Sequence, residues 1–338
     1  MAINYGNLSV YVDQLSQPII SRAVIESQTA KYIDVITGVK YAEQINILDI
    51  NPFVVMPNNA ANNGFTDTGT TILSAVTAIA CPLKINNSFI LEGANSLEQI
   101  WYGQLMKAGS GQESAPSFEE AFMNQLAKYA SLAVDYTLWL GGYVPSGANA
   151  HSGDTAGNTG YLAGCNGILT QLYNTSASGS VKTVTYSGAP TQANIYTIIE
   201  TMIANLPDDM LQLNNISIWC KPSYIDMYKR ALFALNNNTG NYWIDPASSS
   251  DATSTLNITI PGRSNIVLRG TPGLAGQSGN GYQGFVMTND NNLALITDLQ
   301  NDYERTKVWF SNDFEQLRAS TFFKAGGIAK ITSQVIVY

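Results

Sequence analysis

The chain has 338 residues, which is enough to bury one elaborate core or two to three modest ones. Charged residues make up only 12% of it, and the net charge of −8 with scattered basic residues excludes a basic surface for reading nucleic-acid sequence. No segment reaches the roughly 20 apolar residues that span a bilayer, and no basic stretch followed by an apolar run opens the chain, so we expect no membrane segment. A polar, weakly charged surface suits packing against neighbouring copies, because little charge must be desolvated.

Residues 1–50 combine one short helical candidate, Ser16 to Lys31, with a β-rich stretch from Tyr32 to Ile50. This segment has too little apolar surface to form a core of its own. We expect it to lie across another surface, in its own subunit or in the next one. We also expect it to be unordered in a free subunit, because its burial cannot offset the entropy of ordering. The plainer alternative is an ordinary N-terminal helix and strand in one domain.

Residues 51–107 have the pattern of a long hairpin that leads into a short helix. The two β-rich runs are Thr70 to Leu83 and Ser88 to Glu92, and Asn86-Asn87 is the predicted turn between them. A two-stranded hairpin is marginal in water by itself. We therefore expect this segment to need a partner surface.

The longest uninterrupted helical pattern runs from Ser117 to Gly142, and we call residues 117–140 the spine helix. Ser117 and Glu120 form a capping-box sequence at its start, and glycines end it. At 1.5 Å per residue the helix is roughly 35 Å long, the length of a small domain. The face predicted to pack on a broad surface consists of Phe122, Leu126, Tyr129, Ala133, Tyr136 and Leu140.

The stretch after the spine helix predicts a compact α+β unit. It contains a helix from Thr191 to Leu206, a buried strand from Asn215 to Lys221, and a helix from Pro222 to Leu235. The apolar side of the first helix consists of Ile195, Ile198, Ile199, Met202 and Ile203. The second helix carries the apolar residues Tyr224, Met227, Tyr228, Leu232 and Phe233.

Strands dominate the rest of the chain. Residues 258–273 predict two strands, and residues 281–299 predict a hairpin turned by the tetrapeptide at 289–292. Three further β-rich runs close the chain: Tyr303 to Phe310, Phe314 to Lys324, and Ile328 to Val337. We expect an antiparallel sheet here, with its apolar side on the spine helix.

No set of residues points to catalysis. His151 lies in a glycine- and serine-rich loop and, as the only histidine, cannot belong to a multi-histidine metal site. Asp208-Asp209 follows Pro207 and is more simply a helix-end turn than a carboxylate pair. Neither a nucleophile elbow nor a phosphate-binding loop occurs. We therefore expect no enzyme, and no catalytic, cofactor-binding or metal-binding residue.

The three cysteines, Cys81, Cys165 and Cys220, are far apart in the sequence and odd in number. This pattern argues against a disulfide framework and against a Cys-x-x-Cys metal knuckle. We expect them to be small buried apolar residues in a reducing compartment.

The order of these parts resembles the major capsid protein of tailed double-stranded DNA bacteriophages, which has the Hong Kong 97 fold. The resemblance covers nearly the whole chain. Its most telling pieces are GILTQL at 167–172, ISIWCKPSYIDMYKRAL at 216–232, NIVLRGTPG at 265–273, GFVMTNDNNLALITDL at 284–299, and FEQLRASTFFKAGGIAKI at 314–331. They form a pattern of order and spacing, not a strict motif.

The resemblance implies an α+β, Hong Kong 97-like capsid fold with four parts. Residues 1–50 would be an N-terminal arm, and 51–107 an extended β-hairpin loop with a short helix. Residues 108–165 together with 303–338 would form a peripheral domain around the spine helix. Residues 166–302 would form an axial domain.

The function that the resemblance implies is structural. The protein would assemble into pentamers and hexamers of an icosahedral head shell that encloses double-stranded viral DNA without sequence-specific binding. Its partners would be further copies of itself, a portal, scaffolding proteins, and decoration or head-tail proteins. It would be made in the host cell cytoplasm and would reside in the virion.

Two other functions stay open at this point. One is an encapsulin-like compartment shell. The other is a β-rich adhesin or carbohydrate-binding protein, suggested by the Asn-, Ser-, Thr- and Tyr-rich loops, although the amphipathic spine helix counts against it. Some relatives crosslink a lysine of the extended loop to a neighbour's asparagine, and Lys84 lies in the predicted hairpin. A solvated lysine is the plainer explanation for Lys84.

Overall fold

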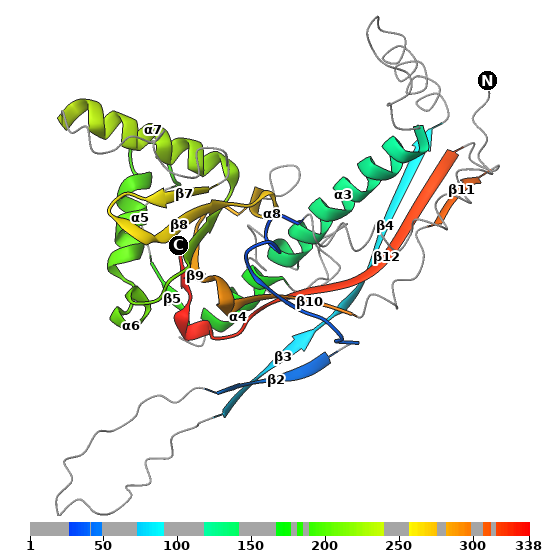
Figure 1. Cartoon of the computed structure of the whole chain (residues 1–338), viewed down its shortest axis with the longest axis horizontal. Coiled ribbons are helices and arrows are strands. Elements are labelled where there is room, and N and C mark those ends of the chain that lie inside the picture. Colours follow the sequence, from blue (N-terminus) through cyan, green and yellow to red (C-terminus); the bar gives the residue numbers. More distant parts are fainter. Residues whose placement is uncertain are drawn as a thin grey trace, which may run out of the picture.

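The computed structural model describes residues 27–40, 42–48, 73–90, 118–141, 167–176, 181–184, 189–239, 257–275, 282–298, 307–311 and 316–338. This part of the chain forms two larger β-sheets and a projecting two-stranded ribbon (Figure 1). Helix α3 runs beside the long strands of one sheet, and its C-terminal end reaches the other sheet (Figure 1).

The first sheet has five strands. Its path is β1 (Asp34–Ile36), β10 (Leu293–Thr297), β12 (Gln316–Ala329) and β11 (Lys307–Ser311), and β4 (Cys81–Ile90) pairs with β12 off this path. Strand β1 is parallel to β10, whereas the other pairs are antiparallel. The 14-residue strand β12 is the centre of this sheet, because it pairs with three of the other four strands.

The second sheet has six strands in the order β5-β13-β9-β6-β8-β7. Their bounds are Lys182–Thr183 for β5, Ile336–Val337 for β13, Val286–Asn289 for β9, Ile216–Cys220 for β6, Arg263–Gly270 for β8 and Asn257–Ile260 for β7. Strand β6 is buried along its whole length, as its sequence predicts. The strands predicted at 258–273 are confirmed as β7 and β8.

The helices of the described chain are α3 (Phe118–Leu140), α4 (Ile168–Ser176), α5 (Ile195–Ala204), α6 (Asp208–Leu211), α7 (Pro222–Thr239) and α8 (Pro272–Ala275). Two short 3-10 turns, η2 (Asp290–Asn292) and η4 (Thr332–Gln334), join strands. The predicted spine helix, α5 and α7 are therefore confirmed, and α7 continues four residues beyond its predicted end at Leu235.

Helix α3 packs against the centre of the five-stranded sheet. Val134, Leu138 and Leu140 share one apolar core with residues of β10 and β12 and with α4. Helix α3 and strand β12 can approach closely because Gly327 of β12 has no side chain. A Cβ at this position would lie 2.7 Å from Leu138 Cδ1 and 2.8 Å from Leu138 O. The expected packing of the C-terminal strands on the spine helix is thus confirmed.

The predicted apolar face of α3 is wrong in detail. Tyr129, placed on that face, is 56% exposed, whereas Ala130, Val134 and Leu138 are buried. The core face is therefore rotated by one residue, because the sheet selects the stripe of smaller side chains that lets α3 approach closely. The predictions for Ser117, Phe122 and Leu126 concern side chains that lie outside the described part of the structure.

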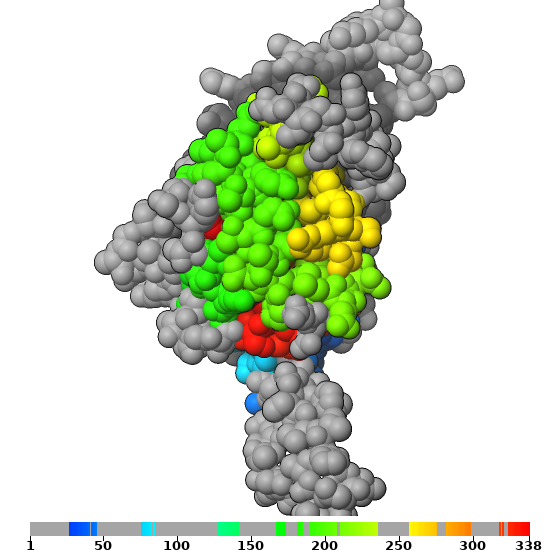
Figure 2. Space-filling view, turned by 90° about the vertical axis from the view of Figure 1, so that its left-hand side faces the viewer, coloured from blue at the N-terminus to red at the C-terminus, as the bar shows by residue number. Residues whose placement is uncertain are grey.

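A second core lies between the six-stranded sheet and the pair α5 and α7. All five apolar residues predicted for α5 are buried in it, as are Tyr224, Tyr228 and Leu232 of α7. Phe233 does not join them and is 57% exposed. In Figure 2, α5 and its neighbours in green lie beside the yellow strands β7 and β8 on this side of the molecule.

The projecting ribbon pairs β2 (Ala42–Leu48) with β3 (Leu73–Ile79) in antiparallel register. The predicted turn at Asn86-Asn87 is wrong, because β4 runs straight through both residues along β12. Residues 27–31, the end of the predicted helix that starts at Ser16, form turns instead of a helix. In each case long-range pairing overrides the local turn or helix preference.

The hairpin predicted at 281–299 is also wrong. Strands β9 and β10 flank the turn η2 as expected, but β9 belongs to the six-stranded sheet and β10 to the five-stranded one. The chain crosses in the same way from β12 through η4 to β13. The two crossings lie side by side, because Asn292 donates to the Ile331 carbonyl at 2.9 Å and accepts from the Ile331 N–H at 2.7 Å.

A substitution in α3 tests the corrected core face. We expect Leu138→Ala to lower the free energy of unfolding by about 2–5 kcal/mol, because it leaves a cavity against β12. Tyr129→Ala, on the exposed side, is expected to change it by less than about 1 kcal/mol. Urea denaturation of the unassembled chain measures both, and equal losses would contradict the observed burial.

Candidate functional site: the junction between the two sheets

The residues weighed for chemistry at the sequence level do not come together. His151 and Cys165 lie outside the described residues, and Asp208-Asp209 opens the short helix α6 after Pro207. Lys84 lies on an exposed position of β4, opposite Phe322 of β12. Within the described ranges no three His, Cys, Asp or Glu side chains are grouped so that they could hold a metal ion.

The cysteine prediction is half right. Cys220 is a free, fully buried thiol, and burial raises its pKa, so it is an inert core residue. Cys81 is disulfide-bonded, which contradicts the expectation that all three cysteines are reduced. Proximity in the fold, and not sequence spacing, decides whether two cysteines can pair.

An open groove of about 350 Å³ lies between α5 and α7. Its lining is mainly apolar and includes Tyr196, Ala231 and Leu235, with Gln192 and Thr197 as polar members. No acid, base or nucleophile stronger than a hydroxyl lines it, so it offers no catalytic machinery. The described helices also include none that is long and apolar enough to cross a bilayer.

The densest polar arrangement of the described chain lies where residues 27–36 cross from α3 to the five-stranded sheet. We call this segment the strap. Its first turn surrounds the carboxylate of Asp135, which is 1% exposed in α3. Ser27 Oγ donates to Asp135 Oδ1 at 2.5 Å, the Gln28 N–H to Oδ2 at 3.0 Å, and the Thr29 N–H to Oδ1 at 3.3 Å. One buried carboxylate thus orders three consecutive residues.

Thr29 extends this arrangement to helix α8. Its hydroxyl accepts from Trp139 Nε1 at 2.9 Å and lies 2.8 Å from the hydroxyl of Thr271, whose oxygen in turn accepts from the Gly273 N–H. Glycine is required at 273 for this contact, since a Cβ would lie 2.5 Å from the Asp135 carbonyl oxygen. The strap, α3 and α8 therefore meet with all of these buried polar groups paired.

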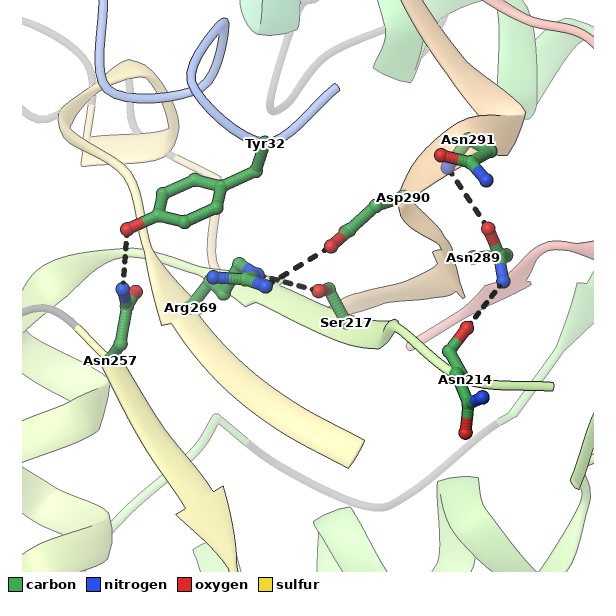
Figure 3. A network of polar contacts seen from close by, with 8 residues as sticks. All are labelled: Tyr32, Asn214, Ser217, Asn257, Arg269, Asn289, Asp290 and Asn291. Carbon is green, nitrogen blue, oxygen red and sulfur yellow. Dashed lines mark hydrogen bonds and ion pairs between the residues drawn. The ribbon is translucent and has the colours of Figure 1, made fainter. Parts of the chain in front are cut away.

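The strap next contacts the six-stranded sheet through Tyr32 (Figure 3). The Tyr32 hydroxyl accepts from Asn257 Nδ2 of β7 at 2.7 Å, and its ring lies over the Arg269 guanidinium of β8 at 3.9 Å. The ring also meets Trp219 of β6 edge-on, with centroids 6.2 Å apart. A cation held over an aromatic face gains more when the pair is partly desolvated, as it is here.

Arg269 connects Tyr32 to the crossing between the sheets. Its Nε donates to Ser217 Oγ at 2.7 Å, and its Nη2 forms an ion pair with Asp290 Oδ2 of η2 at 3.1 Å (Figure 3). Both charged side chains are largely buried, so loss of either would leave an uncompensated charge. Burial raises the pKa of Asp290, and the hydrogen bonds from Ser217 and Arg269 together with the Arg269 charge oppose that rise.

The turn after β9 is held by side-chain amides. Asn289 accepts from the Asn291 N–H at 2.9 Å and donates to the Asn214 carbonyl at 2.9 Å (Figure 3). Next to Asn214, Asn215 has a φ of 65°, a left-handed conformation that asparagine tolerates better than most residues. The Asn215 carbonyl accepts from the Asp290 N–H. The crossing and the loop before β6 are therefore joined.

The polar contacts of this junction hold the strap, α3 and the two sheets together, and we identify no catalytic group among the residues described there. Sequence analysis missed its key residues, Asp135, Arg269 and Asp290. One signal was present: Asp135 is a lone carboxylate between the apolar residues Val134 and Tyr136 of a helix predicted to be half-buried. The hydrogen-bond partners of Asp135 are residues more than 100 positions away in the sequence, which no local pattern identifies.

Comparison with known proteins identifies the fold. A chain in the structure of the satellite phage P4 procapsid, which includes the size determination (Sid) protein, aligns with a TM-score of 0.57 and 10% identity over 95% of this chain and 89% of that one. A chain of Mycobacterium phage Ogopogo aligns with a TM-score of 0.54 and 13% identity, covering 92% and 91%. No protein-family model and no curated protein matches the sequence. The chain therefore has the fold of phage capsid proteins.

A virus-like particle from Pyrococcus furiosus also aligns, over 97% of this chain and 98% of that one, at 8% identity. Its TM-score of 0.46 is too low to support an inference.

The titration of Asp135 gives a testable pH dependence. Burial raises the pKa of Asp135 above its ordinary 3.8, although the hydrogen bonds from Ser27, Gln28 and Thr29 oppose this. The folded state thus holds this proton more tightly than the unfolded state. The resulting stabilisation is fully present below pH 3.8 and is lost as the pH rises through the raised pKa.

We expect Asp135→Asn to flatten this dependence. As the pH rises from 3.8, the free energy of unfolding of the wild type should fall more steeply than that of the variant. The variant is also expected to be less stable throughout, because its amide nitrogen cannot accept from the Gln28 N–H, so the slope is the diagnostic quantity. Urea titrations at several pH values measure it, and parallel curves would show that Asp135 does not titrate as inferred.

Proposed function

We propose that this chain is the major capsid subunit of a tailed bacteriophage head, of the Hong Kong 97 type. In this proposal copies of the chain assemble into pentamers and hexamers of an icosahedral shell around double-stranded DNA, and the protein resides in the virion. The observation that carries the proposal is the capsid fold itself, which extends over nearly the whole chain.

The described strands suggest how the proposed domains divide. The six-stranded sheet with α5 and α7 would be the axial domain, and the five-stranded sheet with α3 the peripheral domain. Because β10 pairs in the five-stranded sheet and β13 in the six-stranded one, we propose that the axial domain ends near residue 292 and regains β13. Because β2 pairs with β3, we propose that the extended loop begins near residue 42 instead of residue 51.

The β2–β3 ribbon supports assembly through contacts between copies. It projects away from the two sheets (Figure 1), and a two-stranded ribbon is marginal in water by itself. Ile79 at its base is 45% exposed, although Val76 and Ile45 pack partly against the small core under the five-stranded sheet. A neighbouring copy that covers this ribbon would supply the missing burial, and repeated head-to-tail contacts of this kind close rings.

The charge of the chain suits a container. A net charge of −8 repels the phosphate backbone, so DNA would be enclosed by the shell without being gripped by it. Because the shell would not attract DNA, separate proteins would have to package it, and we therefore include a portal among the proposed partners. We also include scaffolding and decoration proteins. The adhesin alternative is disfavoured by the capsid fold.

Electron microscopy of the purified chain, with light scattering on the same sample, tests the proposal. We expect closed shells, or rings of five and six subunits. The contents of shells made during expression separate a DNA container from an encapsulin-like compartment, since the latter would hold protein cargo. A folded, monodisperse small species under all salt and scaffold conditions would overturn the proposal.

A substitution at the base of the ribbon tests the proposed contact. We expect Ile79→Asp to raise the concentration needed for assembly about tenfold or more, because an unpaired carboxylate would be buried at every such contact. Ile79→Val, which keeps an apolar β-branched side chain, is the matched control and should assemble as the wild type does. Circular dichroism checks that both variants fold, and normal assembly of Ile79→Asp would place the contact elsewhere.

A further inference from the structure

Helix α3 carries more apolar side chains than the core of the two sheets uses. Tyr129 is 56% exposed, and Leu132 and Ala133 are partly exposed, on the side of α3 that points away from the core residue Val134. We call Tyr129, Leu132 and Ala133 the outer row. Exposed apolar residues that lie beside one another mark a contact surface, whereas a single exposed residue does not.

The outer row begins where the strap is attached to α3. Asp135, Leu132 and Tyr129 follow one another at a spacing of three residues, so their side chains form one ridge along the helix. Exposure increases along this ridge, from 1% at Asp135 to 56% at Tyr129. Ser27, the first described residue of the strap, donates to Asp135 Oδ1 at 2.5 Å and therefore lies at the buried end of the ridge.

The contacts of the strap show in which direction it runs along α3. Ser27 binds Asp135, whereas Thr29, two residues later, also accepts from Trp139, which lies one helical turn closer to the C-terminal end of α3. The strap therefore runs in the same direction as α3 at this point. Residues that precede Ser27 would leave Asp135 toward Leu132, and so toward the outer row.

The sequence before Ser27 has the composition of a partner for the outer row. Residues 16–26 read SQPIISRAVIE and contain four aliphatic residues, Ile19, Ile20, Val24 and Ile25. Ser16 is a favourable helix N-cap, and Pro18 is tolerated because it falls in the first helical turn. The helix predicted from Ser16 to Lys31 turns out to form turns over residues 27–31, which leaves residues 16–26 for a helix.

The length of such a helix matches the outer row. Ten residues at 1.5 Å per residue give a helix of about 15 Å. Leu132 and Tyr129 are three and six residues from Asp135, which corresponds to roughly 5 and 9 Å along α3. A helix that begins at the strap and runs beside α3 is therefore long enough to cover both side chains.

Two other segments outside the described residues adjoin α3 in the sequence, and both fit the outer row less well. Residues 91–117 join α3 at Phe118, roughly 16 Å along the helix from Tyr129. Residues 142–166 are rich in Gly, Ser, Asn, Ala and Thr, and contain only two large aliphatic residues, Val144 and Leu162. Residues 16–26 combine four aliphatic residues with an attachment point one turn from Leu132.

We propose that residues 16–26 form a short helix that docks on the outer row of α3 in the same subunit. The tether at Asp135 gives this segment a high effective concentration, so weak apolar contacts suffice for docking, and a second copy competes poorly in dilute solution. For residues 16–26 this replaces the expectation of an unordered segment in a free subunit. The docking is a property of the single subunit, and its test does not depend on shell assembly.

Photo-crosslinking of the dilute, unassembled full chain tests the docking site. The photoreactive residue p-benzoylphenylalanine replaces Tyr129, whose exposed aromatic side chain leaves room for it. We expect mass spectrometry to find position 129 joined mainly to residues 16–26. Mixing isotope-labelled with unlabelled chains separates crosslinks within one chain from those between copies. Crosslinks mainly to residues 91–117 or 142–166, or only between copies, would overturn the proposal.

Hydrogen exchange measures the same contact with natural side chains. In Tyr129→Asp we expect the amides of residues 20–26 to exchange about fivefold faster or more, because a carboxylate would face aliphatic side chains. Phe233→Asp is the matched control, since Phe233 of α7 is an aromatic residue of nearly equal exposure, 57%. Amides of β12 should keep wild-type protection in both variants. Equal exchange of residues 20–26 in the two variants would show that they do not dock on Tyr129.

A substitution in the docking segment gives a second test that leaves α3 unchanged. In Val24→Asp we expect the yield of crosslinks from position 129 to residues 16–26 to fall about tenfold, because a charge replaces an aliphatic contact. An unchanged yield would show that the aliphatic residues of this segment do not hold it on α3.

Discussion

The fold depends on the close approach of α3 to strand β12. Gly327 makes that approach possible, because any side chain there would collide with Leu138. The approach places Val134 and Leu138 in one core with β10, β12 and α4, and it brings Asp135 and Trp139 on the neighbouring side of α3 to the six-stranded sheet. A single helix therefore organises both sheets, because its apolar residues share one core with strands of each sheet and Asp135 adds a buried polar junction beside that core.

Although the chain has few charged residues, three of them lie in the polar junction between the two sheets. Asp135 and Asp290 are almost entirely buried and Arg269 is largely buried. Asp135 accepts hydrogen bonds from residues 27–29, and Arg269 donates to Ser217 and to Asp290 Oδ2, whereas Asp290 Oδ1 is buried without a hydrogen-bond partner. Groups of this kind add little net stability compared with apolar packing, but they permit only one arrangement, since any other leaves a buried charge unpaired. Here they define where the N-terminal strap lies and how the two sheets face each other. Such a precise orientation would be valuable in the proposed shell subunit, which would have to match many identical neighbours.

The proposed shell function places two different demands on the structure. Closed shells need a fixed surface, whereas assembly of one chain into both five-fold and six-fold rings needs some adjustment between its parts. The apolar core that α3 and α4 share with both sheets would supply the fixed surface, so adjustment would have to come from segments outside that core. The projecting β2–β3 ribbon, which lacks a core of its own, would then be completed by a neighbour.

The sequence by itself determined the local elements whose patterns are strong: the spine helix, α5 with all five of its apolar residues, the buried strand β6, and the strands at 258–273. Periodicity and composition suffice for these because burial on one side dictates the pattern. Only the tertiary structure decided which strands pair, and so it overturned the turn at Asn86-Asn87 and the hairpin at 281–299, where β9 and β10 join different sheets. It also selected Leu138 over Tyr129 as the core face of α3 and gave Asp135 its partners. These choices depend on contacts between residues far apart in the chain, and their energies are larger than the local preferences that they override.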